Sequence, residues 1–101
     1  MATLHIEHPI SDLPTWLRAF SGFADVRRRA GVRAERVFTP VDDDAYVYVD
    51  LDFDDVEQAA AFQRSFETRV WTSREASPAL AGTPKARVLE SVDAGPSSPR
   101  T

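Results

Sequence analysis

The chain contains no cysteine, and this absence excludes several kinds of chemistry. Disulfides, thiol nucleophiles, thiolate zinc sites and iron–sulfur clusters all require a cysteine sulfur. Any reaction carried out by this protein must therefore use oxygen and nitrogen groups. A chain without cysteine also fits a reducing compartment, so the cytoplasm is the expected location.

The sequence also lacks a long apolar run. Neither a transmembrane segment nor a signal peptide is found, so we expect no membrane partner. Basic residues are fewer than acidic ones, 12 against 16, which gives a net charge of −4. Nucleic-acid binding draws most of its affinity from neutralising phosphates, so this charge balance argues against a nucleic-acid partner.

The length of 101 residues, with 43% hydrophobic and 28% charged residues, is typical of one globular domain. Residues 1–92 carry strand or helix patterns and are predicted to form that domain. Residues 93–101 are small or polar and include breakers, with nothing to bury. They are predicted to be a disordered tail.

Residues 44–53 alternate between apolar and polar side chains and predict a strand with two different faces. Its apolar face suits a covering layer of helices. Its other face carries Tyr46, Tyr48 and Asp50. Such a combination of aromatic rings and carboxylates is typical of a surface that meets a ligand or a partner.

The remaining elements follow from similar patterns. Apolar residues at helical spacing predict two helices, and short alternating or β-branched runs predict three further strands. The strands are expected at 2–8, 32–38 and 86–92. The first helix is expected at 13–31, with a weak point at Ser21-Gly22, and the second is capped by Asp54 and extends to Val70.

The order strand, helix, strand, strand, helix, strand predicts an α+β fold, the ferredoxin-like β-α-β-β-α-β sandwich. In this topology a four-stranded antiparallel sheet carries both helices on one face, and the first and third strands lie at its centre. The other face is left uncovered. A second copy of the same face is the simplest cover, so the sequence predicts a homodimer.

Several segments resemble one known family. These are His5-Ile6-Glu7-His8-Pro9 followed by Asp12 and Trp16, the strand at 46–53, and the stretches 78–82 and 87–90. Together they resemble the dimeric α/β-barrel superfamily, and in particular small actinobacterial members near its antibiotic-biosynthesis monooxygenase-like branch. The resemblance implies the fold and the homodimer.

The resemblance also implies a function. Members of the superfamily include cofactor-independent monooxygenases, so we expect an enzyme of this kind that needs no cofactor and acts on a small aromatic or polyketide-like metabolite. The alternative is a non-catalytic dimeric module that binds a small ligand or assists another protein.

The candidate catalytic residues are His5, Glu7, Tyr48 and Asp50. His5 and Glu7 lie two apart on one strand and share its polar face, and a histidine beside a carboxylate can act as acid or base near neutral pH. Tyr48 or Asp50 could complete the cluster from the neighbouring strand. The alternative is that His5 and Glu7 are a hydrogen-bonded pair in a dimer interface.

Two residues are candidate ligand contacts, Tyr46 on the polar face and Trp16 on the first helix. Trp16 lies among apolar neighbours, so a packing role in the core is its alternative. His5, Glu7 and Asp50 could hold a metal. However, no metal is predicted, because His8 is expected on the opposite strand face. RNA-recognition domains share the topology and stack bases on such aromatics, but Asp50 would repel phosphate.

Overall fold

The computed structural model describes residues 1–69, 81–82 and 84–92. The strands are β1 (Ala2–Pro9), β2 (Ala34–Phe38), β3 (Tyr46–Phe53) and β4 (Lys85–Glu90). The helices are α1 (Leu13–Gly22), α2 (Ala24–Arg29) and α3 (Val56–Arg69). The predicted end of the second helix at Val70, most of the loop before β4 and the predicted tail at 93–101 lie outside the described residues.

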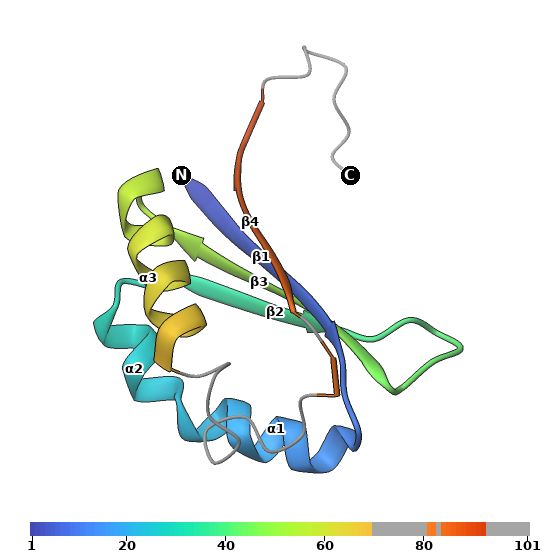
Figure 1. The fold of residues 1–101 in the computed structure, drawn as a ribbon. Coiled ribbons are helices and arrows are strands. Elements are labelled where there is room, and N and C mark those ends of the chain that lie inside the picture. Colours follow the sequence, from blue (N-terminus) through green and yellow to red (C-terminus); the bar gives the residue numbers. More distant parts are fainter. Residues whose placement is uncertain (70–80, 83, 93–101) are drawn as a thin grey trace.

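The four strands form one antiparallel sheet in the order β2-β3-β1-β4. β1 and β3 lie at its centre, as the sequence predicts, and the helices α1, α2 and α3 lie on one side of it (Figure 1). The predicted ferredoxin-like α+β fold is therefore confirmed. None of the described helices is both long and apolar enough to cross a membrane.

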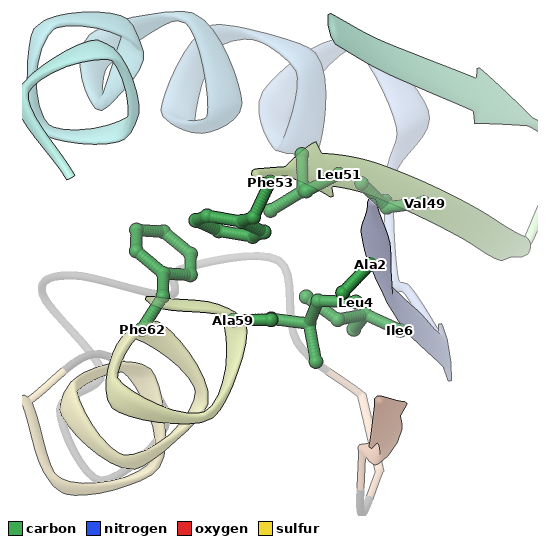
Figure 2. Close-up of a cluster of buried hydrophobic side chains, with 8 residues drawn as sticks. All are labelled: Ala2, Leu4, Ile6, Val49, Leu51, Phe53, Ala59 and Phe62. Carbon is green, nitrogen blue, oxygen red and sulfur yellow. The ribbon is translucent and has the colours of Figure 1, made fainter. Parts of the chain in front are cut away.

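The core lies between the sheet and the helices, and strand alternation positions it. On both β1 and β3, every second side chain is buried on the helical side of the sheet, and Leu4 and Phe53 are examples. Figure 2 shows these side chains meeting Ala59 and Phe62 of α3. Each large side chain buried in this way stabilises the fold by about 1.5 to 3 kcal/mol.

The first predicted helix is divided into α1 and α2, close to the weak point identified in the sequence. Phe23 lies between them with φ −101° and ψ 13°, which is not helical. The start of α1 agrees with the prediction, because the Asp12 carboxylate accepts a hydrogen bond of 2.8 Å from the backbone N–H of Thr15.

The prediction that Asp54 caps the next helix is wrong by one residue. The cap is Asp55, whose carboxylate accepts a 2.8 Å hydrogen bond from the backbone N–H of Gln58. Asp54 instead binds the Arg33 guanidinium through both carboxylate oxygens, at 3.1 and 2.8 Å. Two adjacent aspartates offer the same capping chemistry, and the second of them is the cap.

Candidate functional site

The sheet face turned away from the helices, called the open face below, carries the polar side chains of the two central strands. In the β1–β3 register His5 lies opposite Asp50 and Glu7 lies opposite Tyr48. Directly opposite residues of an antiparallel pair project from the same side of the sheet. The register therefore brings together side chains that are more than forty residues apart in the sequence.

His5 is held between two carboxylates. Its Nδ1 lies 2.7 Å from Asp50 Oδ1, and its Nε2 lies 2.9 Å from Glu7 Oε2. An ionised carboxylate can only accept hydrogen bonds, so both ring nitrogens must donate and the ring is an imidazolium. We call His5, Glu7 and Asp50 the His5 clasp, because they join β1 to β3 at the middle of the open face.

The electrostatics of the clasp agree with this protonation state. Partial burial of His5 lowers its pKa, but the hydrogen bonds and charges of Asp50 and Glu7 outweigh burial and raise the pKa above 6.5. In return, the bond from His5, followed by that from Tyr46, lowers the pKa of Glu7. With His5 protonated and both carboxylates ionised, the clasp carries two negative charges and one positive charge.

Tyr46 extends the network by one member. Its hydroxyl donates a 2.9 Å hydrogen bond to Glu7 Oε1, and this bond raises the pKa of the phenol. A continuous hydrogen-bonded chain therefore runs from Tyr46 through Glu7 and His5 to Asp50. The Tyr48 ring borders it, 5.3 Å from the ring of Tyr46 and 6.1 Å from that of His5.

A second polar network lies beside the clasp, toward the other end of β3. Both oxygens of Asp52 accept from the Arg36 guanidinium at 2.9 Å, and Thr3 donates to one of them at 2.8 Å. The Arg36 bonds, with a smaller effect from Thr3, lower the pKa of Asp52. Asp52 and Arg36 thus form an ion pair without net charge beside the clasp.

The arrangement decides which proton steps the cluster can perform. With both nitrogens donating, His5 has no free lone pair, so it can give a proton but cannot take one. The proton acceptors of the cluster are the carboxylates of Glu7 and Asp50. In the part of the chain that the structure describes, no group of three or more histidine, aspartate or glutamate side chains is arranged to hold a metal ion.

The structure brings together five of the six candidate residues, all on the open face: His5, Glu7, Tyr46, Tyr48 and Asp50. Trp16 is not among them. It lies in the helical layer, packs against the core and stacks on Phe20 at a centroid distance of 5.0 Å. Its packing role is therefore observed, whereas a ligand contact at Trp16 stays a prediction and would belong to a different site.

Two ionisable side chains are buried on the helical side of the sheet, His8 of β1 and Arg27 of α2. His8 is 4% exposed, and burial lowers its pKa. Arg27 is 3% exposed and binds Glu35 through Nε at 2.7 Å, with its guanidinium 3.6 Å from the centre of the Phe20 ring. In the sequence, the burial of Arg27 could have been suspected from its spacing of seven residues from Phe20, which places both on one stripe of the first predicted helix.

Comparison with known proteins gives matches only at the level of structure. No family model matches the sequence, and no curated protein matches it. A solved structure of an antibiotic biosynthesis monooxygenase is similar with a TM-score of 0.64 and 13% identity, over 91% of this chain and 99% of the other. A proposed antibiotic biosynthesis monooxygenase from Nitrosomonas europaea gives a TM-score of 0.68 and 11% identity, over 92% of this chain and 91% of the other.

A third similar structure is a NIPSNAP domain protein from Burkholderia xenovorans. Its TM-score is 0.63 at 16% identity, and the match covers 95% of this chain and 99% of that protein. Such low identities carry information on the fold and none on the reaction. The chain therefore shares its fold, a ferredoxin-like α+β fold, with these three structures.

Proposed function

We propose that this protein is a homodimer, formed through the open face, that acts as a cofactor-independent monooxygenase-like enzyme on a small aromatic or polyketide-like metabolite in the cytoplasm. The observation that carries the proposal is the hydrogen-bonded chain from Tyr46 through Glu7 and His5 to Asp50, placed at the centre of a sheet face that no described helix covers. The names of the similar structures support the choice of reaction.

The dimer part of the proposal rests on the apolar margins of the open face. Phe38 lies opposite Tyr48 in the β2–β3 register, and Leu89 lies opposite Thr3 in the β1–β4 register. Phe38 is 50% exposed and Leu89 is 43% exposed. Apolar side chains on both margins of a polar centre suit a second copy of the same surface, related by a two-fold axis.

The chemical part of the proposal assigns a role to each charged group. In the proposed reaction, O2 oxidises an acidic methylene group of the substrate to a carbonyl, and one water is released. The substrate itself supplies the four electrons. The first step is removal of a proton from the substrate, for which the carboxylate of Asp50 or Glu7 is the acceptor. The His5 imidazolium would then stabilise the substrate anion, and the rings of Tyr46 and Tyr48 would contact its aromatic body.

A second function, a non-catalytic dimeric ligand-binding or accessory module, is favoured by a different observation. Both ring nitrogens of His5 and both carboxylate oxygens of Glu7 already have partners within the protomer. Hydrogen bonds completed within one protomer suit a structural role in an interface, because a substrate would have to compete with partners that are already in place.

Two measurements on the purified protein test these functions. Sedimentation velocity at micromolar concentration should report a dimer, and a monomer would contradict the proposal. Oxygen uptake should then be measured with a set of polycyclic phenols and aromatic ketones.

The variants His5→Ala and Tyr48→Phe distinguish the enzyme from the accessory module. In the enzyme they should reduce turnover or ligand binding at a protein concentration at which sedimentation still reports a dimer. In the accessory module they should change dimer stability, with no oxygen uptake from any compound in either variant or the parent protein.

A further inference from the structure

The His5 clasp lies at the centre of the surface through which the proposed dimer forms. His5, Glu7 and Asp50 have side chains that are 29%, 27% and 25% exposed, so each is half-buried in one protomer and would be covered by a second copy. We propose that the proton on His5 controls the association of the two open faces, which pair while the imidazolium bridges the two carboxylates and separate when the proton is lost. This inference rests on the proposed homodimer.

Loss of the proton removes a donor from the clasp. A neutral imidazole donates through one nitrogen and presents a lone pair at the other, so either Asp50 or Glu7 would face that lone pair at a distance of 2.7 or 2.9 Å. The formal charge of the clasp changes from −1 to −2. A carboxylate left without its donor can be solvated in a monomer, but in a covered interface it is costly.

The two-fold symmetry of the proposed interface doubles the effect. An isologous interface presents the same patch from both subunits, so both clasps change charge together. The approach of the two faces then brings together two carboxylates without a histidine donor, one from each clasp, for every two protons lost. The association is therefore linked to the binding of protons, one at each clasp.

The other charged groups around His5 come from each neighbouring strand. On β4, Arg87 lies opposite His5 and Lys85 lies opposite Glu7. On β2, Arg36 is paired with Asp52 of β3. None of these groups is a histidine, and the second histidine of the chain, His8, is buried on the helical side. His5 is therefore the side chain of this face whose charge changes near neutral pH.

The sign of the pH effect follows from the carboxylates. They raise the pKa of His5 above 6.5 despite its partial burial, and His5 lowers the pKa of Glu7 below 4.5. The clasp is complete between these two pKa values and is lost as the pH rises through the raised pKa of His5. Above that pH the dimer dissociation constant should increase, by up to about tenfold per pH unit for each linked proton.

The experiment is sedimentation velocity of the full chain over a concentration series from pH 6 to pH 9.5. The dissociation constant should be lowest near pH 6 to 7 and should rise through the pH at which NMR shows His5 losing its proton. The two histidines give separable signals, and His5→Gln assigns them by removing one. The same variant should show a dissociation constant that no longer depends on pH in this range.

A matched pair of variants tests the geometry. Asp50→Asn removes a carboxylate that binds His5, so it should lower the pKa of His5 and move the rise of the dissociation constant to lower pH. Asp52→Asn changes an aspartate on the same strand and face that binds Arg36 and Thr3 instead. It should leave the pH of the rise unchanged, although it can change the affinity.

The outcomes separate this inference from the proposed homodimer. A monomer at every pH contradicts both. A dimer whose dissociation constant stays level while His5 loses its proton contradicts the inference alone, and so does a rise that persists in His5→Gln.

Discussion

Arg27 is the charged side chain most deeply placed in the described part of the chain, and its contacts predict a large effect on stability. It is 3% exposed, binds both oxygens of Glu35 at 2.7 and 3.1 Å, and donates to the Phe20 carbonyl. Arg27→Ala should lower the free energy of unfolding by about 2 to 4 kcal/mol, because it removes a buried ion-pair partner and leaves its space unfilled.

Arg28→Ala is the matched control, and chemical denaturation measures the free energy of unfolding of both variants. Arg28 pairs with Asp25, but both side chains are exposed, at 71% and 68%. Exposed pairs of this kind stabilise a protein by about 0 to 1 kcal/mol. Equal losses in the two variants would contradict the role assigned to Arg27.

Most residues of the candidate site could be identified from the sequence because strand alternation alone assigns a face. His5 and Glu7 share a face by their spacing, and Tyr46 and Asp50 share one in the same way. A hydrogen-bonded pair of His5 and Glu7 was one of the two interpretations of their spacing, and that bond is present. The bonds from His5 to Asp50 and from Tyr46 to Glu7 could not be predicted, since they depend on the register between β1 and β3. The ion pair of Arg27 was missed for a similar reason, because Glu35 reaches it from a different element.

At the level of elements, the ends of α1 and α2 predict opposite effects of a glycine-to-alanine substitution. Gly31 has φ 102°, and the N–H groups of Gly31 and Val32 bond the carbonyls of Arg28 and Arg27, which is a left-handed helix cap. Gly31→Ala should therefore lower the free energy of unfolding by about 1 to 2 kcal/mol. An added Cβ would also approach the Gln58 side chain to 3.2 Å.

Gly22 provides the contrast. It is the last residue of α1, its φ is not positive, and an added Cβ would meet nothing within 4 Å. Gly22→Ala should raise the free energy of unfolding by up to about 0.5 to 1 kcal/mol, because alanine loses less backbone freedom in a helix. Urea denaturation of both variants measures the two changes, and effects of the same sign would contradict this account of the α1–α2 segment.

The faces of the central strands were predicted correctly, whereas the ends of several strands and helices were missed by one or two residues. A period of two shows directly in a chain whose central strands bury every second side chain, as β1 and β3 do. The ends of helices depend on single capping contacts. Asp55 caps α3 and Asp54 binds Arg33, and no local pattern distinguishes the two aspartates.

For the whole molecule, the sheet has two sides that differ in what covers them, and this difference can be tested with exposed apolar residues. Phe38 and Leu89 lie on the margins of the open face by their strand register, and Val26 lies on α2 in the helical layer. Their exposures are similar, at 50%, 43% and 44%. Similar exposure makes them comparable, and they lie on opposite sides of the sheet.

Replacing Phe38 or Leu89 by serine should weaken the proposed dimer, since each change removes apolar area that a second copy would bury. A loss of about 1.4 kcal/mol raises the dissociation constant tenfold, so an increase of about tenfold is expected for each variant. Val26→Ser should leave the dissociation constant unchanged in the same sedimentation experiment. If Val26→Ser dissociates the dimer while the other two variants do not, the subunits associate through their helices and the open face remains free for a ligand.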